Sequence, residues 1–539
     1  MKLYNIRKYI LVFAIVALQI IMYSCANVGY PSGGEVDKIP PKVLAFIPLN
    51  ETNNFGSNKV IIQFDEYIQL KDVDNQVLIS PPFENKPEIV AKGKAVHITI
   101  KDTLRPNTTY LFQFKNAVVD NNEGNPLPSL NYVFSTGNVL DSLSVKGKVS
   151  DAFTHKADEE IYVLLYSDFA DSVVSGGRPV YITKTDKEGN FEFNYISEGS
   201  YKVIALKDDD KSLTYSNVSE KIGFVDDTIR PRYVVDSCDT VVDIVLHTFV
   251  QESAKQRITS SKLVKSGKAV LTAQCPLVNP IISSEAEIIT SINSSRDTLQ
   301  IWAMEEVDSL SLIISDVSGL NDTLKLRYFK KRGRQSRETF MKTNIKSTFP
   351  YYDSIRIRFT NPIDSVLRPS ELVYIKTATD SFFTSLCFDS VMLNATVAVN
   401  LVPDTSYSII IPGNTLVDIY GNKNDTLILK TKVNKPSDYG AIKINLKMAD
   451  DSTQYIVQIL SDKDKVVAES VGVMGLHVFP NLVAGTYKVR VIADSNGNTK
   501  WDAGNYWQGK QSEPVYYLPK AIELRSNWDI EETFSPAEY

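Results

Sequence analysis

Two internal duplications constrain the fold of this chain more than any other feature of its sequence. Residues 104–110 recur as residues 401–407, an offset of 297, with the leucine, proline, threonine and tyrosine of the motif kept. A second pattern recurs at an offset of 286: seven positions between 189 and 208 reappear between 475 and 494. Duplicated blocks of this length indicate repeated structural units, so we expect a series of small modules.

The segments around these repeats alternate apolar and polar residues. Such runs occur at residues 60–64, 355–359, 442–446 and 487–491. A period of two predicts strands with one buried face, and only residues 251–265 offer a weak helix candidate. Many short strands separated by Asn, Asp and Gly turns favour β-sandwiches. We therefore expect an all-β protein built from tandem β-sandwich modules.

The first copy of the longer-offset repeat resembles a bacterial Ig-like module of the S-layer type. Its opening Pro-Pro-x-Val falls on residues 40–43, and Phe64-Asp65-Glu66 fits the end of a characteristic strand. The second copy keeps the pattern but has Thr360 and Asn361 at the Asp-Glu positions. The resemblance implies an Ig-like sandwich for each copy.

The repeat at the shorter offset resembles transthyretin-like, carboxypeptidase-regulatory-like sandwiches. It carries a Gly and a Phe, followed by Leu-x-x-Gly-x-Tyr-x-Val, which reads from Leu482 to Val489 in the second copy. The first glycine makes a turn, and the phenylalanine and leucine fill the core. As a whole, the chain resembles the Ig-like-domain lipoproteins of Bacteroidetes.

The N-terminus has the pattern of a lipoprotein signal peptide. Basic residues precede an apolar stretch at 11–22, which is too short for a comfortable transmembrane helix. The stretch ends at Ser24 and Cys25, which resembles a bacterial lipobox and implies acylation of Cys25 with palmitate-type chains. A monotopic anchor helix with an incidental cysteine is the alternative. We expect a lipid anchor in the outer membrane. The sequence does not distinguish a protein that faces the periplasm from one that faces the cell surface.

At about 150 residues per domain, 539 residues predict three or four domains, but the two offsets favour five modules of about 100 residues. The expected segments are a signal peptide at 1–24, a tether with the lipidated cysteine at 25–40, an Ig-like domain at 41–137, a transthyretin-like sandwich at 141–235, an Ig-like sandwich without an internal match at 236–345, an Ig-like domain at 346–434 and a transthyretin-like sandwich at 437–534.

One loop near the C-terminus has the spacing of a calcium ligand set. Asp494, Asn496, Asn498 and Asp502 occupy positions 1, 3, 5 and 9, which places oxygen atoms on one side of the loop. The loop lacks the Gly at position 6 and the Glu at position 12 of an EF-hand, and Asn and Gly are also ordinary turn residues. Structural Ca²⁺ and a plain turn therefore both stay open, and no other cofactor is expected.

Aromatic residues gather in the last 40 residues of the chain. Trp501, Tyr506, Trp507 and Trp528 could form a platform that stacks on glycans or peptides. The alternative is that these rings pack over the terminal hairpin of a small sandwich.

Little in the sequence supports catalysis or nucleic-acid binding. There are only four His, scattered along the chain, and the formal net charge is −6. We therefore expect no catalytic residue. The predicted function is a non-catalytic envelope rod that binds a protein or glycan partner or acts as a scaffold, and the alternative is a periplasm-facing accessory subunit of an assembly or secretion machine.

Overall fold

The computed structural model describes residues 37–232, 243–252, 256–265, 267–328 and 339–535. Within them nearly all regular structure is β-strand, which confirms the expected fold class. The predicted alternation is also confirmed, because Val60, Ile62 and Phe64 are buried while Lys59 and Gln63 are exposed. No helix in the described part of the chain is long and apolar enough to cross a bilayer.

Module 1 (residues 43–135) is a sandwich of short sheets. Its main sheet has the order β1-β2-β6-β5, and β4-β7-β9 faces it. Its elements are β1 (Val43–Ile47), β2 (Lys59–Phe64), β3 (Ile68–Leu70), α2 (Val73–Gln76), β4 (Leu78–Ser80), β5 (Glu88–Lys92), β6 (Ala95–Thr99), β7 (Thr109–Gln113), β8 (Val118–Asp120) and β9 (Asn131–Ser135).

Module 2 (residues 143–250) is built on one seven-stranded sheet, β12-β11-β14-β15-β16-β10-β13. Its last strand, β16, pairs in parallel with β10, so the expected boundary at residue 235 is too early. Its elements are β10 (Leu143–Asp151), β11 (Tyr162–Tyr166), α3 (Val173–Gly176), β12 (Tyr181–Lys184), β13 (Asn190–Ile196), β14 (Lys202–Leu206), β15 (Lys221–Phe224) and β16 (Asp243–Val250).

Module 3 (residues 258–327) packs the sheet β17-β18-β21-β20 on β19-β22-β23. The prediction of a weak helix at 251–265 is wrong, because residues 258–265 form the strand β17, which pairs antiparallel with β18. Its strands are β17 (Ile258–Lys265), β18 (Lys268–Ala273), β19 (Ile281–Ser284), β20 (Ile288–Ile292), β21 (Thr298–Ala303), β22 (Ser309–Ser315) and β23 (Asn321–Arg327).

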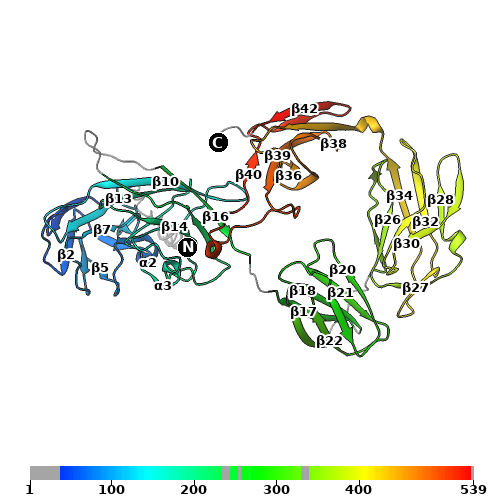
Figure 1. Ribbon diagram of the computed structural model, residues 1–539, viewed down its shortest axis with the longest axis horizontal. Helices are drawn as coiled ribbons and strands as arrows, with labels where there is room; N and C mark the ends of the chain where they lie inside the picture. The colour runs from blue at the N-terminus through cyan, green and yellow to red at the C-terminus, as the bar shows by residue number, and fades with distance from the viewer. Residues whose placement is uncertain (1–36, 233–242, 253–255, 266, 329–338, 536–539) are drawn as a thin grey trace, which may run out of the picture.

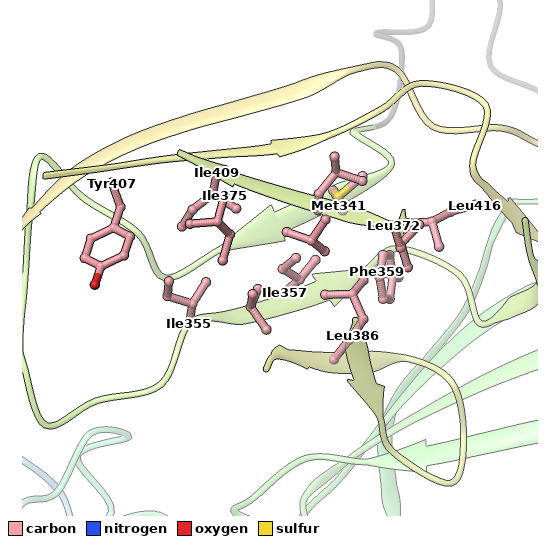
Figure 2. Close-up of a cluster of buried hydrophobic side chains, with 14 of the residues drawn as sticks. Met341, Ile355, Ile357, Phe359, Leu372, Ile375, Leu386, Tyr407, Ile409 and Leu416 are labelled. Atoms are coloured by element: carbon pink, nitrogen blue, oxygen red, sulfur yellow. The ribbon is translucent and has the colours of Figure 1, made fainter. Parts of the chain in front are cut away.

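Module 4 (residues 341–433) packs β24-β26-β31-β30 against β25-β34-β32-β28-β29. Figure 2 shows Ile355, Ile357 and Phe359 directed into this core. Because β24 pairs with β26, the expected boundary at residue 345 is too late. Its elements are β24 (Met341–Thr343), β25 (Thr348–Phe349), β26 (Arg356–Phe359), β27 (Ile363–Val366), η1 (Pro369–Glu371), β28 (Val373–Lys376), β29 (Ser381–Thr384), β30 (Leu386–Phe388), β31 (Asn394–Val397), β32 (Ser406–Ile411), β33 (Leu416–Asp418) and β34 (Leu427–Val433).

Module 5 (residues 439–534) repeats the strand pairing of module 2. Its first strand pairs antiparallel with β38 and in parallel with β42, as β10 does with β13 and β16. Its elements, with η2 just before them, are η2 (Pro436–Asp438), β35 (Tyr439–Leu446), β36 (Gln454–Ser461), β37 (Val466–Gly472), β38 (Gly475–Val483), β39 (Gly485–Asp494), η3 (Tyr506–Gln508), β40 (Val515–Tyr517), β41 (Ile522–Leu524) and β42 (Asp529–Phe534).

The motif repeated at offset 297 forms the same tyrosine corner in modules 1 and 4. The hydroxyl of Tyr110 accepts a hydrogen bond from the Arg105 backbone N–H at 2.9 Å, and Tyr407 accepts one from Val402 at 2.9 Å. The motif is therefore structural, since it fixes the entry into β7 and into β32.

Hydrogen bonds join modules 1 and 2, modules 3 and 4, and modules 4 and 5. Ser80 accepts the N–H of Ile182 between modules 1 and 2, and Tyr420 donates to the Ala303 carbonyl between modules 4 and 3. Tyr351 and Tyr352 both donate to Asn481 between modules 4 and 5. Figure 1 shows the result: module 5 lies back beside module 2, between it and module 4. The chain is thus folded back on itself and does not form the expected rod.

Candidate functional site

The lipidation candidate Cys25 and most of the tether lie outside the described residues. The anchor therefore stays a prediction. The sites that the structure does describe are the loop after β39 and the aromatic residues that come after this loop.

The predicted calcium loop begins where β39 ends. Asp494 is buried, and its carboxylate accepts the backbone N–H groups of Asn498 at 3.0 Å and Thr499 at 2.7 Å. The side-chain amide of Gln454 on β36 donates to it at 2.9 Å. Three donors thus fix the first candidate ligand at the base of the loop.

The structure brings the other three predicted residues together above this base. The side-chain amides of Asn496 and Asn498 both donate to the carboxylate of Asp502. The side-chain oxygen Oδ1 of Asn498 accepts the N–H of Lys500 at 2.8 Å. In this arrangement the loop is a hydrogen-bonded turn, which is the plainer of the two expectations.

Sequence reasoning missed one carboxylate of this loop, that of Glu513. This buried side chain accepts the N–H groups of Ser495 at 2.8 Å and Asp502 at 3.0 Å. Burial, followed by the nearby carboxylates of Asp502 and Asp494, raises the pKa of Glu513. Glu513 lies eleven positions after Asp502, so no local spacing pattern could have linked the two.

The same loop recurs in module 2 at the offset of 286 residues. There the Asp208 carboxylate accepts the N–H groups of Ser212 at 3.1 Å and Leu213 at 2.8 Å, as Asp494 accepts those of Asn498 and Thr499. The N–H of Ser216 donates to buried Glu220 at 3.1 Å, as that of Asp502 donates to Glu513. The fold therefore builds one turn twice.

The module 2 loop gathers more charge than its sequence suggested. Carboxylate oxygens of Asp208, Asp210 and Glu220 lie within 4.8 Å of one another. Burial, and then the neighbouring Asp210, raises the pKa of Asp208. Hydrogen bonds from Ser212 and Ser216 lower the pKa of Asp210 to about 2. Clustered carboxylate oxygens are the ligands that Ca²⁺ prefers, so the module 2 loop has the donor chemistry for it.

The aromatic residues after the module 5 loop do not form a free platform. Tyr506 is only 2% exposed and packs among side chains of module 2, with its ring centroid 5.3 Å from that of Phe224. Its hydroxyl donates to the Asp171 carbonyl at 3.1 Å, and its N–H donates to Gln251 at 3.2 Å. Tyr506 is thus a contact between modules, and its expected role in ligand stacking is wrong.

The three tryptophans are divided among different surroundings. The Trp501 ring lies 4.8 Å from that of Phe153 in module 2. Trp507, 45% exposed, lies in η3 near Tyr215, whereas Trp528, 53% exposed, precedes β42 and contacts Arg525. Only Trp507 and Trp528 therefore keep substantial surface for a ligand.

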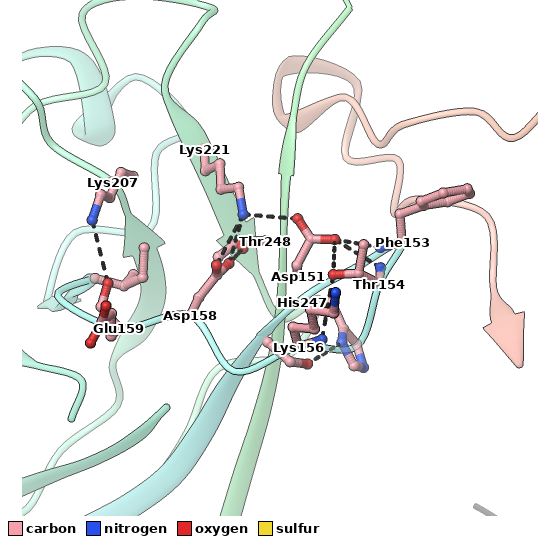
Figure 3. A network of polar contacts seen from close by, with 12 residues as sticks. Asp151, Phe153, Thr154, Lys156, Asp158, Glu159, Lys207, Lys221, His247 and Thr248 are labelled. Atoms are coloured by element: carbon pink, nitrogen blue, oxygen red, sulfur yellow. Dashed lines mark hydrogen bonds and ion pairs between the residues drawn. The ribbon is translucent and has the colours of Figure 1, made fainter. Parts of the chain in front are cut away.

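A polar network in module 2 positions the partner of Trp501. Lys221 donates to Asp151 at 2.8 Å and to Asp158 at 3.0 Å. Figure 3 draws both contacts as dashed lines. Asp151 also accepts the N–H groups of Phe153 and Thr154. Burial opposes ionisation of Asp151, but the hydrogen bonds from Lys221 and Thr154 outweigh it and lower the pKa. The network holds the turn that presents Phe153 to module 5.

Phe153 is enclosed from the module 5 side. The Arg490 guanidinium lies 4.2 Å from the Phe153 ring centroid, and the Tyr517 hydroxyl donates to the Phe153 carbonyl at 3.0 Å. Lys156 of module 2 also pairs with Asp464 of module 5 at 3.3 Å. The junction between modules 2 and 5 is therefore apolar at Tyr506 and polar at its rim.

A comparison with protein families identifies residues 37–136 as a bacterial Ig-like domain, in agreement with the expectation for 41–137. A comparison with curated proteins found no match.

Solved structures similar to this chain include the major pilin BcpA of Bacillus cereus, at 10% identity, 73% of this chain, 99% of that chain and a TM-score of 0.16. Another is the surface layer protein SbsC, domains 1–6, at 10% identity, 90% of this chain, 68% of that chain and a TM-score of 0.14. A third is SGBP-B of the Bacteroides ovatus mixed-linkage glucan utilization locus, solved with a heptasaccharide, at 10% identity, 75% of this chain, 93% of that chain and a TM-score of 0.17.

Proposed function

We propose that this chain is a non-catalytic, lipid-anchored envelope protein that serves as a rigid multi-domain binding or scaffolding frame. The observation that carries the proposal is the burial of Tyr506 of module 5 within module 2. A contact between residues 335 positions apart in the chain, Asp171 and Tyr506, fixes distant modules relative to each other. A contact of this kind keeps the surfaces of different modules at fixed positions relative to one another, as a scaffold for a binding partner requires.

The proposal places the frame in the outer membrane of a bacterium of the Bacteroidetes type, anchored through Cys25. The motif before Cys25 and the Ig-like domain at 37–136 support it. Modules 2 and 5 are proposed as transthyretin-like sandwiches because their sequence pattern and their strand pairing are shared. The second candidate is a periplasm-facing accessory subunit of an assembly or secretion machine.

The anchor is tested with the full chain in a Gram-negative host labelled with an alkyne analogue of palmitate. Wild type should carry the label and sediment with the outer membrane, and Cys25→Ser should lose both properties. Cys387→Ser is the matched control, because it removes a cysteine that is exposed on module 4. Label that persists in Cys25→Ser would overturn the anchor.

Orientation and partnership are tested on the same cells. Digestion by proteinase added to intact cells supports a surface frame, and full protection favours the periplasmic accessory subunit. In-cell crosslinking followed by purification in detergent should then capture a defined envelope partner with wild type. A chain recovered only as itself would contradict the scaffolding role.

A further inference from the structure

Module 4 carries a hollow on the outer face of the sheet β24-β26-β31-β30, away from its core. Its volume is about 610 Å³, within the range of small-ligand sites. Its lining comes from all four strands and the residues beside them: Lys342, Thr343, Asn344, Arg356, Ile357, Arg358, Cys387, Phe388, Asp389, Asn394, Ala395 and Thr396.

The strand register explains why cations gather there. Lys342 on β24 lies opposite Arg358 on β26, and Arg358 lies opposite Asn394 on β31. Arg356, two residues from Arg358, shares its face of the sheet and lies opposite Thr396. The buried residues between them, such as Ile357, point into the core, so the polar side chains point outward.

Two of the three cations are not neutralised by acids. Arg356 forms a fork with Asp353, at 3.0 and 3.1 Å. Arg358 instead donates to the neutral side chain of Gln300 in module 3, at 3.2 Å. Within the described ranges, no ion pair joins Lys342 or Arg358 to a carboxylate.

The single carboxylate in the lining is already committed to the turn that bears it. Asp389 accepts the N–H of Leu393 at 2.9 Å and the side-chain amide of Asn394 at 2.7 Å. Burial opposes ionisation of Asp389, but the hydrogen bonds from Asn394 outweigh it and lower the pKa. The hollow therefore presents net positive charge together with amide and hydroxyl groups.

We propose that this hollow binds an anionic saccharide, whose carboxylate or phosphate groups contact Lys342 and Arg358 and whose hydroxyls contact the neighbouring polar side chains. A guanidinium group matches both oxyanions through paired N–H donors, and an ammonium group adds a point charge. The inference rests on the proposed binding role and moves the contact from the C-terminal aromatic residues to module 4.

Other anionic partners fit the hollow less well. The aromatic ring in the lining, Phe388, is partly buried and lies 5.8 Å from Phe359 of the core, so it offers no free platform for base stacking. A lipid surface would meet a protruding apolar face, whereas these side chains line a concavity.

Binding is measured by calorimetry on the full chain, with an oligogalacturonate as the carboxylate probe and mannose 6-phosphate as the phosphate probe. Maltotriose is the neutral control and a short polyglutamate is the peptide control. We expect the oligogalacturonate, mannose 6-phosphate or both to bind, and neither maltotriose nor polyglutamate to bind. Binding by polyglutamate alone, or by none of the probes, would overturn the proposal.

The site is tested by the double variant Lys342→Gln/Arg358→Gln, which should weaken binding about tenfold or more, because charge-assisted contacts are lost. The matched control is Lys376→Gln/Lys430→Gln, which removes equal charge from exposed positions on the other sheet of module 4. Equal weakening in both variants would show general charge attraction and overturn the site. Unchanged unfolding midpoints verify that both variants fold.

Cys387 gives a second, local measurement because its exposed thiol lies in the lining. The probe that binds should slow alkylation of Cys387 in wild type, read by mass spectrometry, and should not do so in Lys342→Gln/Arg358→Gln. No protection despite measured binding would place the saccharide elsewhere. Failure here leaves the Cys25 labelling and the crosslinking results unaffected, so the two proposals can be separated.

Discussion

The loops after β14 and β39 share one turn and differ in the length of chain beyond that turn. Glu220 lies four positions after Ser216 in module 2, and Glu513 lies eleven positions after Asp502 in module 5. Glu220 and Glu513 nevertheless accept hydrogen bonds from equivalent backbone N–H groups, those of Ser216 and Asp502. The extra seven residues of module 5 include Tyr506, which is inserted into module 2.

This difference shows that two modules with the same strand pairing differ in whether the loop is inserted into a neighbouring domain. The hydrogen-bonded turn holds both ends of the loop, so the inserted residues leave the sandwich undisturbed. The shared strand pairing of the two modules agrees with this view. The module 2 loop contributes Tyr215, whose ring lies 6.1 Å from that of Trp507. The longer module 5 loop instead inserts Tyr506 into module 2 and so acts as a latch between the two domains.

The largest expected effect comes from breaking the latch with Tyr506→Ala. Truncating a buried aromatic ring typically costs about 3–5 kcal/mol, and here the loss falls on the junction. Lys156 and Lys488 both pair with Asp464, so an amine crosslink between them reports closure. The crosslink should fall sharply, and the radius of gyration should increase.

The matched control for the latch is Trp528→Ala, an aromatic residue of module 5 that is 53% exposed and contacts Arg525 of its own module. It should leave the Lys156–Lys488 crosslink nearly unchanged. Equal crosslinking in Tyr506→Ala and wild type would show that the rim contacts alone hold the modules together.

Calcium sharpens the comparison between the two carboxylate loops. If each loop binds Ca²⁺ with the affinity of extracellular sites, about 5 mM Ca²⁺ should stabilise each of modules 2 and 5 by about 1–2 kcal/mol relative to EDTA. Asp208→Asn should remove the stabilisation of module 2 by Ca²⁺, and Asp494→Asn should remove that of module 5. Identical unfolding curves in Ca²⁺ and EDTA would establish both loops as plain turns.

A single rim hydrogen bond gives a smaller effect. Tyr517→Phe removes the donor to the Phe153 carbonyl and keeps the ring, so the junction should weaken by about 1 kcal/mol. The measurement is the Lys156–Lys488 crosslink yield in increasing urea. Tyr516→Phe, on the neighbouring residue of β40, is the control.

The smallest effect is a change in how stability depends on pH. The pKa of Glu513 is raised above its ordinary value of 4.5 in the folded chain. Protonated Glu513 therefore contributes fully to the free energy of unfolding below pH 4.5, and this contribution is lost as the pH rises through the raised pKa. In EDTA, wild type should therefore lose stability relative to Glu513→Gln as the pH rises above 4.5. A constant difference in unfolding midpoint would contradict this.

The local parts of the fold could be predicted from the sequence. The alternation at 442–446 and 487–491 marked strands because a period of two places one face in a core, and Ile442 and Val489 are fully buried. The spacing of Asp494, Asn496, Asn498 and Asp502 marked a turn whose side chains do meet. These features depend on neighbours a few residues away.

Other features could not be predicted in this way. Strand β16 lies beyond residue 235, yet it completes module 2 by parallel pairing with β10. The aromatic cluster near the C-terminus suggested a ligand platform because nothing local indicates that Tyr506 meets Phe224. The cations of the module 4 hollow come from strands whose register is set by the whole sheet.

The sequence by itself determined that this protein is a series of β-sandwich modules with two duplicated types, because period and offset are properties of the chain alone. Only the tertiary structure decided that the series folds back, with Tyr506 of module 5 buried in module 2. Contacts across hundreds of residues depend on the shapes of two finished surfaces, and neither surface exists until its module has folded.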